Sequence, residues 1–251
     1  MKVSIITVSF NSAASIIATL RSVASQSYRD IEHIVIDGGS TDGTLEILDR
    51  YRDKLAHVIS EPDDGIYHAM NKGLRYATGD VVGFLNSDDQ YAHADVIDLV
   101  VKQMAVAGVE AVFSDAAFVN RQAPDTIVRR YSSRHFRPST IPWGWMPAHP
   151  TLFLRREVYA RFGGFKADYE IAGDFEYVAR VFWNTGIRYT YVPAVLVKMG
   201  TGGVSTSGWA ATELLNREVL RACRENGIRT NIFMIGSKYL LKIFEFVAAK
   251  A

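Results

Sequence analysis

The first hundred residues repeat one order of segments: an apolar run, a polar turn and an amphipathic stretch. The apolar runs predict four strands, at Lys2–Val8, Glu32–Ile36, His57–Ser60 and Val81–Leu85. The stretches between them predict three helices, from Asn11-Ser12 to about Ser25, at Leu45–Tyr51 and at Ile66–Tyr76. Strands that alternate with helices favour parallel pairing through right-handed crossovers. The sequence therefore predicts an α/β fold with a mostly parallel central sheet flanked by helices.

Three of the polar turns are acidic: Asp37–Asp42, Asp63–Asp64 and Asp88–Asp89. Because the carboxyl ends of parallel strands meet at one edge of a sheet, we expect these turns to lie together, where open α/β sheets bind ligands. Adjacent carboxylates repel each other unless a positive group neutralises them, and a divalent cation carrying a diphosphate meets that need. The stretch GDVVGFLNSDD taken alone fits a capped turn equally well.

Composition and missing motifs exclude several functions. The net charge of +1 argues against a nucleic-acid partner, and the single cysteine, Cys223, excludes an intramolecular disulfide. The turn Ser9–Ser12 after the first strand is no dinucleotide-binding glycine loop, and the sequence contains no P-loop motif. The N-terminus lacks the features of a signal peptide, and no apolar stretch reaches the ~18–20 residues of a transmembrane helix. We expect a cytoplasmic protein, or one at the inner face of a membrane.

The second half predicts further strands and helices. Strands are predicted at Glu110–Ser114, Ile127–Tyr131, Thr151–Arg155, Arg188–Val192 and Val195–Met199. Helices are predicted at Ala94–Ala107, Glu157–Phe162, Phe175–Trp183, Trp209–Glu225 and Asn231–Ala249. The last helix has a wide apolar face, which suits packing on the domain or in a homodimer. Basic residues on its polar face make contact of residues 231–251 with a membrane surface the alternative.

Four features of this half have two interpretations each. Asp174 precedes a predicted helix, so it is either an N-cap or a functional carboxylate. Two tryptophans, Trp143 and Trp145, either enter the core or stack on sugar rings. A basic cluster is either solvated or in contact with a diphosphate; its members are Arg129, Arg130, Arg134 and Arg137. The segment 200–206 is either a mobile closing loop or a connector.

Six stretches together resemble the ordered motif set of the family 2 glycosyltransferases, which have the GT-A, Rossmann-like fold. They are SIITVSFN, IDGGSTDGT, DGIYHAMNKG, ATGDVVGFLNSDD, His149–Phe165 and AGDFE at 172–176. The resemblance covers about residues 1–205. It implies a catalytic domain over 1–205, with a nucleotide-sugar-binding half at 1–115, an acceptor-binding half at 116–205 and a C-terminal helical extension at 206–251.

The resemblance also implies roles for single residues. Asp37 matches the acidic residue that recognises the nucleotide base, although Gly38 replaces a second Asp found in many members. Asp89 is the implied ligand of a Mn²⁺ or Mg²⁺ cofactor, and Asp174 the implied catalytic base. The other implied donor-binding residues are Thr7, Ser9, Asn11, Asp64, Asn71, Lys72, Ser87 and Asp88. Contacts to the diphosphate or acceptor are implied for His149, Gly202, Gly203 and Ser205, and the aromatic side chains of Trp143 and Trp145 are candidates for contact with the acceptor.

These roles make physical sense for sugar transfer. A metal ion stabilises the leaving diphosphate, and a carboxylate takes the proton of the acceptor hydroxyl. One displacement with one base inverts the anomeric carbon, so we expect an inverting, metal-dependent enzyme of surface polysaccharide or glycolipid assembly. Its partners would be a nucleotide-diphosphate sugar and a glycan or polyprenyl-linked acceptor. The alternative is a protein that keeps the fold and binds nucleotide sugars or glycans without catalysis.

Overall fold

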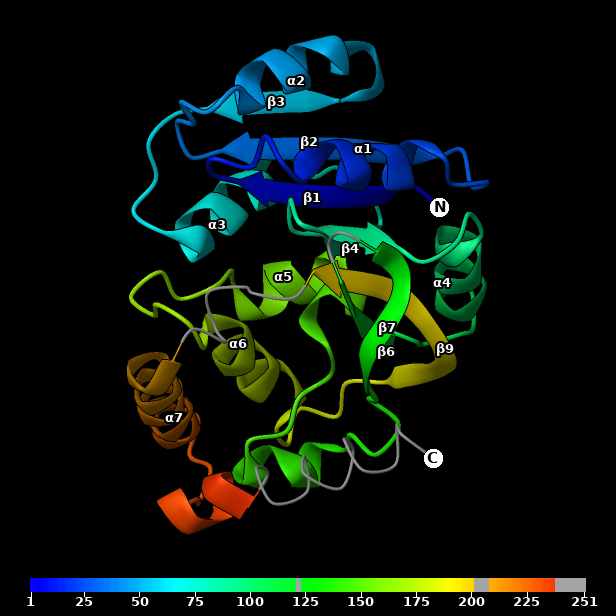
Figure 1. The fold of residues 1–251 in the computed structure, drawn as a ribbon. Coiled ribbons are helices and arrows are strands. Elements are labelled where there is room, and N and C mark those ends of the chain that lie inside the picture. The colour runs from blue at the N-terminus through cyan, green and yellow to red at the C-terminus, as the bar shows by residue number, and fades with distance from the viewer. Residues whose placement is uncertain (121–122, 201–207, 238–251) are drawn as a thin grey trace.

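The structure, a computed structural model, describes residues 1–120, 123–200 and 208–237 (Figure 1). The predicted Asn231–Ala249 helix begins at residue 232 and is described as far as 237. Gly202, Gly203 and Ser205 lie outside the described residues. In the part of the chain that is described, no helix is both long and apolar enough to cross a bilayer.

The first part of the chain forms the predicted alternation of strands and helices. The strands are β1 (Val3–Ser9), β2 (Ile31–Asp37), β3 (His57–Ser60) and β4 (Val81–Phe84). The helical segments are α1 (Ile16–Ala24), α2 (Thr44–Arg50), η1 (Arg52–Lys54) and α3 (Ile66–Tyr76). The four strands pair in parallel in the order β3-β2-β1-β4, which confirms the prediction for this half.

The sheet continues through the second part of the chain with mixed pairing. Its strands are β5 (Asp89–Tyr91), β6 (Ala111–Asn120), β7 (Ala123–Tyr131), β8 (Phe153–Arg155) and β9 (Tyr189–Gly200). β8 is antiparallel to both β4 and β6, whereas β6 and β9 pair in parallel. The predicted α/β fold is confirmed; its parallel pairing holds for the first four strands and for β6 with β9, and the pairs that β8, β7 and β5 form are antiparallel.

Two strand predictions change in the structure. The strands predicted at Arg188–Val192 and Val195–Met199 are one strand, β9, whose register against β6 shifts beside Pro193 and Ala194. Proline cannot donate a ladder hydrogen bond, so the strand continues through a bulge there. The three-residue β5 was not predicted, because three residues are too few for a periodic pattern.

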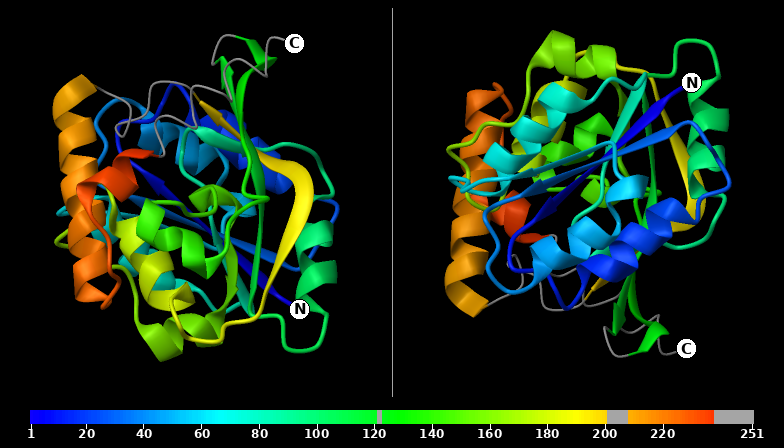
Figure 2. Two further views of the ribbon diagram at one scale, coloured as in Figure 1. Left: turned by 90° about the horizontal axis from the view of Figure 1, so that it is seen from below. Right: turned by 90° about the horizontal axis from the view of Figure 1, so that it is seen from above.

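Helices cover both faces of the sheet (Figure 2). The second part contributes α4 (Val96–Met104), η2 (Pro138–Trp143), η3 (His149–Thr151), α5 (Arg156–Phe162), α6 (Gly173–Phe182) and α7 (Gly208–Glu225). Alternate residues of β1 enter different clusters: Ile6 and Val8 join the core under α3, whereas Val3 and Ile5 join the core on the α4 face. The core under α3 also includes residues of α6 and α7, among them the buried Cys223.

The predicted boundary between residues 115 and 116 falls inside β6, and α7 packs against α6. The two parts therefore share one sheet. The division into a donor half, an acceptor half and an extension stays a proposal about roles.

Candidate functional site

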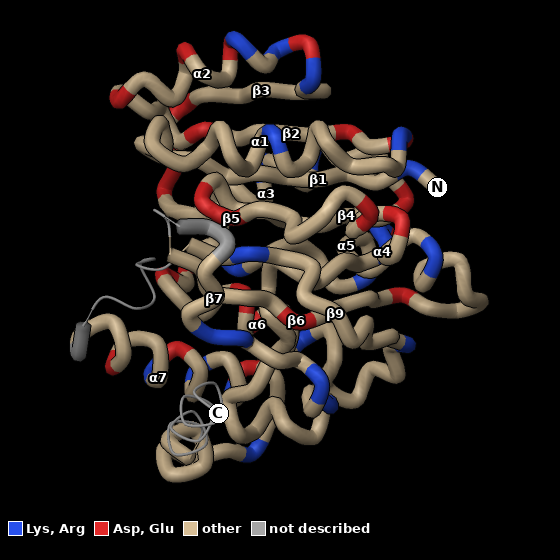
Figure 3. The backbone as a smooth tube through the Cα atoms, turned by 45° about the vertical axis from the view of Figure 1, so that its right-hand side comes forward, with Lys and Arg blue, Asp and Glu red and all other residues tan. Residues whose placement is uncertain are grey.

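The acidic turns lie at one edge of the parallel half, as the topology predicts. Ser9, Asp37 and Ser60 are in register at the ends of β1, β2 and β3, and β4 ends next to β1. Figure 3 shows the acidic residues at the start of β5 on this side of the molecule. The sheet edge therefore brings together side chains from three separate turns.

Asp37 is completely buried and organises its turn. Its carboxylate accepts hydrogen bonds from the hydroxyls of Ser9 at 3.0 Å and Ser60 at 2.8 Å, and from the Ser40 hydroxyl. The backbone N–H groups of Gly39 and Ser40 donate to it at 3.1 and 2.9 Å. For Asp37 to contact the nucleotide base, some of these hydrogen bonds would have to be replaced. That contact stays a prediction.

The loop after β1 is tied to the other turns. The Asn11 side chain accepts from the Thr41 N–H at 3.0 Å, and the Asn11 N–H donates to Ser40 Oγ at 2.8 Å. The hydroxyls of Ser12 and Ser87 lie 2.7 Å apart. These bonds hold the ends of β1, β2 and β4 in a fixed relation.

Thr7 is a predicted donor contact whose side chain is fully buried. Its hydroxyl lies 2.9 Å from Nε2 of His33, and burial lowers the pKa of that imidazole to about 3. The neutral His33 ring and Thr7 thus form an internal pair on β1 and β2. A donor contact by Thr7 stays a prediction.

Asp88 and Asp89 follow β4, and Asp89 is the first residue of β5. Asp89 is 5% exposed, and its carbonyl oxygen accepts from the Thr19 hydroxyl at 2.7 Å. Just before them, Oδ1 of Asn86 is buried without a hydrogen-bond partner. Over the described ranges, no three His, Cys, Asp or Glu side chains converge to hold a metal unaided.

This donor set fits a Mg²⁺ or Mn²⁺ ion that a diphosphate also binds. Such hard cations prefer oxygen ligands, and Mg²⁺ is commonly held by one or two carboxylates together with substrate phosphates. Asp89 would supply a carboxylate ligand with Asp88 beside it, and the partnerless Asn86 oxygen would add a neutral acceptor nearby.

In the turn at 61–65, where donor contacts by Asp64 and Lys72 are predicted, Lys72 is bound to the turn itself. Lys72 forms ion pairs with Glu61, at 2.9 Å, and with Asp63, and its ammonium donates to the carbonyl of Pro62 at 3.2 Å. Asp64 is exposed. Lys72 therefore neutralises the largely buried Asp63. If Lys72 also contacts the donor, its ammonium would have to bind the donor and this turn at the same time.

Asn71 joins α3 to the segment before α6. Its amide donates to the carbonyl of Phe165 at 2.7 Å, and its Oδ1 accepts from the Phe165 N–H at 2.8 Å. A Cβ on Gly164 would lie 2.3 Å from that Oδ1, so glycine is required beside it. The contacts of Asn71 indicate a positioning function.

Asp174 lies in the first turn of α6 and is not its N-cap, which is Ala172. The carboxylate is half-buried, and Oδ1 accepts from the Phe175 N–H at 2.8 Å and from the Tyr67 hydroxyl at 3.5 Å. Burial raises the pKa of the Asp174 carboxyl, while His149 opposes the rise. A raised pKa makes this carboxylate a stronger base than an exposed aspartate.

Aromatic rings connect this carboxylate to the strand that carries Asp88 and Asp89. Phe84, the last residue of β4, stacks on the ring of His149 with centroids 5.8 Å apart, and Phe165 contacts both rings. His149 interacts electrostatically with Asp174, and burial lowers the pKa of its imidazole. The end of β4 and the start of α6 therefore border one apolar, ring-lined region.

The tryptophans and the basic cluster lie in exposed or half-buried positions. Trp143 is 44% exposed at the end of η2, and Trp145 is half-buried. Arg130 forms an ion pair with the buried Asp115 at 2.6 Å, and the Arg129 guanidinium lies 4.5 Å from the Phe118 ring centre. Arg134 and Arg137 are exposed. Contacts of these residues with an acceptor or diphosphate stay predictions.

Sequence reasoning missed three residues of the site. Tyr67 contacts Asp174; it stands in the motif DGIYHAMNKG, but no role is predicted for it from the sequence. A Cβ on Gly173 would lie 2.6 Å from the Tyr67 ring, so only glycine fits there. No sequence pattern indicates this close approach. Phe10 is 64% exposed at the sheet edge, and its ring would lie 3.3 Å from a Cβ on Gly38. An aromatic residue in a polar turn was the available signal for Phe10.

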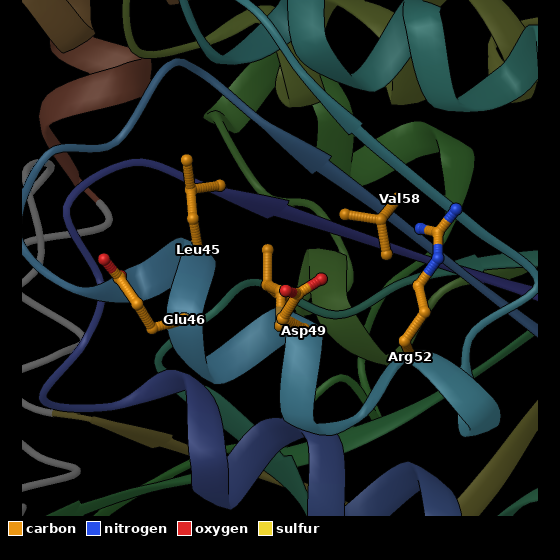
Figure 4. Close-up of a pocket in the computed structure, with 6 residues that line it drawn as sticks. Leu45, Glu46, Asp49, Arg52 and Val58 are labelled. Carbon is orange, nitrogen blue, oxygen red and sulfur yellow. The ribbon is translucent and has the colours of Figure 1, made fainter.

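A separate surface hollow of about 340 Å³ lies between α2 and β3 (Figure 4). Its lining residues are Leu45, Glu46, Leu48, Asp49, Arg52 and Val58. None of them is a predicted site residue, and β3 is the outer strand of the parallel half. The hollow is therefore distinct from the acidic sheet edge.

The described fold also occurs in solved glycosyltransferase structures. Staphylococcus aureus TarS 1–349, solved in complex with UDP-GlcNAc, matches 88% of this chain and 66% of its own, with a TM-score of 0.68 and 20% identity. The mannosyltransferase PcManGT of Pyrobaculum calidifontis, solved with GDP-Man and Mn²⁺, matches 89% of this chain and 63% of its own, with a TM-score of 0.66 and 25% identity. The chain spans 40% of a longer TarS chain.

Sequence relatives give the same family. An uncharacterized glycosyltransferase of Mycobacterium tuberculosis is 34% identical over 181 residues, which are 71% of this chain and 68% of the relative. A PGL/p-HBAD biosynthesis glycosyltransferase of Mycobacterium bovis is 28% identical over 246 residues, 92% of this chain and 89% of the relative. The family described as "Glycosyl transferase family 2" matches residues 4–162. With its GT-A fold and these matches, the chain belongs to glycosyl transferase family 2.

Proposed function

We propose that this glycosyltransferase transfers a sugar from a nucleotide-diphosphate donor to an acceptor hydroxyl, with inversion, and that Asp174 is the base. The observation that carries the proposal is the convergence of two carboxylate sites on one ring-lined region. Phe84, four residues before Asp88, stacks on His149, which in turn interacts with Asp174. The proposal places the donor diphosphate and the acceptor base at the two ends of this ring-lined region, so that the displacement takes place between them.

The donor half of the proposal rests on the acidic sheet edge. The nucleotide would lie at the ends of β1 and β2, with its base against the exposed Phe10 ring above Gly38. Asp88 would contact the donor and Asp89 a Mn²⁺ or Mg²⁺ ion on the diphosphate. Such an ion stabilises negative charge on the leaving group. Solved relatives bind UDP-GlcNAc, or GDP-Man with Mn²⁺, which supports this donor class.

The transfer step needs one base. Asp174 accepts the acceptor's hydroxyl proton as the hydroxyl oxygen bonds to the anomeric carbon, and the bond from that carbon to the diphosphate breaks with its electron pair leaving on the phosphate oxygen. Attack from the side opposite the leaving group inverts the carbon. The raised pKa of Asp174 supports the assignment, because a stronger base accepts the proton more readily.

The acceptor and the setting are further proposals. The named role of the Mycobacterium bovis relative favours assembly of a surface glycolipid or polysaccharide, with a glycan or polyprenyl-linked acceptor near Trp143 and Trp145. Residues 231–251 would contact a membrane surface at its cytoplasmic side or a second copy of the chain. The 86% exposure of Phe233 supports a contact of this kind. Co-sedimentation of wild type and Phe233→Ser with anionic vesicles tests the membrane contact. Sedimentation equilibrium of the two proteins tests the contact with a second copy.

The donor is identified by a thermal-shift and calorimetric screen of UDP and GDP sugars with Mn²⁺. A ligand that binds only the folded state raises the midpoint of unfolding. We expect one base and sugar to stabilise the protein, and the stabilisation to fall in Phe10→Ala. If no nucleotide sugar binds with or without metal, the donor assignment is wrong. If a donor binds but wild type neither hydrolyses nor transfers it, the non-catalytic alternative is right.

A further inference from the structure

Helix α7 binds the segment that precedes Asp174 through hydrogen bonds and ion pairs. Three of its side chains, Glu218, Arg221 and Glu225, are spaced three and four residues apart and so share one helix face. Glu225 accepts from Lys166 Nζ at 2.8 Å and from the Tyr169 hydroxyl at 3.0 Å. Arg221 forms an ion pair with Asp168 and donates to that residue's carbonyl at 3.1 Å. These contacts continue along the segment toward Asp174, and α7 lies beside α6 (Figure 1).

Glu218 makes the contacts closest to the base. Its side chain is 6% exposed, and Oε1 accepts from the backbone N–H of Glu170 at 2.8 Å. Oε2 accepts from the N–H groups of Ile171 at 2.9 Å and Ala172 at 2.7 Å. One buried carboxylate therefore binds three consecutive N–H groups immediately before α6, and charge-assisted bonds of this kind are the strong ones.

The same segment is held from its other side by Tyr67. The carbonyl of Ile171 accepts from the Tyr67 hydroxyl at 2.6 Å, while the Ile171 N–H bonds to Glu218. Tyr67 also approaches Asp174, three residues further along. The N-cap Ala172 makes no side-chain cap hydrogen bond, so within the contacts described the ordering of this helix start comes from α3 and α7.

We propose that Glu218 is a positioning residue for Asp174: it fixes residues 170–172 and thereby the place and surroundings of the base. The inference rests on the proposed role of Asp174. It gives the buried face of α7 a positioning role, although the family match ends at residue 162 and the sequence predicts only an extension there.

The test compares Glu218→Gln with Glu213→Gln. Gln has the shape of Glu but only one acceptor oxygen, so it leaves N–H groups of residues 170–172 without partners. Glu213 lies on the same helix, is exposed, and pairs only with Arg217 among the contacts described. Activity is the release of nucleoside diphosphate from UDP-GlcNAc or GDP-mannose with Mn²⁺ and water as acceptor. Hydrogen exchange of the 170–172 amides is measured without donor.

We expect kcat of Glu218→Gln to fall about 10- to 100-fold, because small displacements of a catalytic group are this costly. KM for the donor should stay within about twofold, the acidic limb of the kcat profile should move, and the 170–172 amides should exchange faster. Tyr67 and His149 are the titratable groups facing Asp174, so a displaced segment changes its pKa. Glu213→Gln should match wild type throughout.

A merely structural role lowers the unfolding midpoint without moving kcat or the acidic limb of the folded enzyme. That result overturns the inference, and so do unchanged 170–172 amides. The proposed function fails separately: full turnover by Asp174→Asn refutes the base, whereas an inactive Asp174→Asn beside a normal Glu218→Gln refutes only the positioning. If wild type releases no nucleoside diphosphate from either donor, the exchange of the 170–172 amides alone decides whether Glu218 holds the segment.

Discussion

The hydroxyl of Tyr67 lies 3.5 Å from Oδ1 of Asp174 and donates its shorter bond, 2.6 Å, to the carbonyl of Ile171. Burial raises the pKa of the Tyr67 phenol, so the group stays a donor. One side chain of α3 therefore contacts both the carboxylate at the start of α6 and the segment before it. Helix α3 and the proposed base are linked through the core, and we expect changes at this contact to affect the rate of transfer before they affect donor binding.

Replacing Asp174 by Asn should abolish transfer and keep donor binding. Asn cannot accept the acceptor's proton, and general-base catalysis is typically worth 10²- to 10⁴-fold. The measurement is kcat beside the calorimetric affinity for the donor with Mn²⁺. Turnover like that of wild type would remove Asp174 as the base.

The rate should fall on the acid side at a higher pH than for an ordinary aspartate. The base must be deprotonated, and burial raises the pKa of Asp174 above the usual value of about 3.9. The rate is therefore full above that raised pKa and is lost as the pH falls through it. A kcat profile with its acidic midpoint at or below about 3.9 contradicts this.

Replacing Asp89 by Ala should eliminate the metal-dependent part of donor binding. The loss follows because a divalent ion on the diphosphate would lose a carboxylate ligand. The affinity for the donor is measured with Mn²⁺ and with EDTA, and Asp53→Ala, an exposed site in η1, serves as the control. Equal affinities of wild type with and without metal would refute the clamp.

Replacing Gly173 by Ala should displace the Tyr67 ring and lower kcat about 10-fold or more. A Cβ there would lie 2.6 Å from a ring carbon, closer than any van der Waals contact. Gly236→Ala is the matched control, because its Cβ meets nothing within 4 Å. Comparable kcat values for the two variants would show that the site adapts to the methyl group.

Acid should destabilise the fold through Glu32. Burial tends to raise its pKa, but hydrogen bonds from Lys2, Ser4 and Thr78 outweigh it and lower the pKa to about 2. A lowered pKa contributes stability that is complete above the unfolded value of about 4.3 and is lost as the pH falls toward 2.

Urea unfolding of Glu32→Gln across this pH range checks the effect. The variant should be less stable than wild type at pH 7, and the two should converge as the pH approaches 2. The exposed Glu157→Gln is the control. A constant difference between Glu32→Gln and wild type would mean that ionisation of Glu32 contributes nothing.

Much of the fold followed from local patterns. The 3.6-residue period located α3 at Ile66–Tyr76, and the topology of alternating strands brought the acidic turns to one edge. The pairing of β5 and of the antiparallel β8 was not predicted, because each strand has only three residues. Pairing partners distant in sequence are set by tertiary packing, which single-sequence periodicity does not encode.

The site divides in the same way. Asp88 and Asp89 were predicted because they follow an apolar run within a family motif, and Asp174 because it precedes a predicted helix within another. Donor contacts were predicted for Asp37 and Thr7 as well, but the burial of their side chains depends on partners from other strands. Glu218 lies 44 residues beyond Asp174 in an ordinary amphipathic helix, and only the packing of α7 on α6 brings it to the segment before the base.

The position of β8 in the sequence also determines when the central sheet can be completed during synthesis. β8 pairs with β4 and β6, yet it emerges from the ribosome about 70 residues after β4, or several seconds later at usual translation rates. During that interval the apolar strand Val81–Phe84 has an open edge, which is a template for aggregation. Substitutions in β8 should therefore reduce the yield of expressed protein and increase its dependence on chaperones before they change the activity of the molecules that fold.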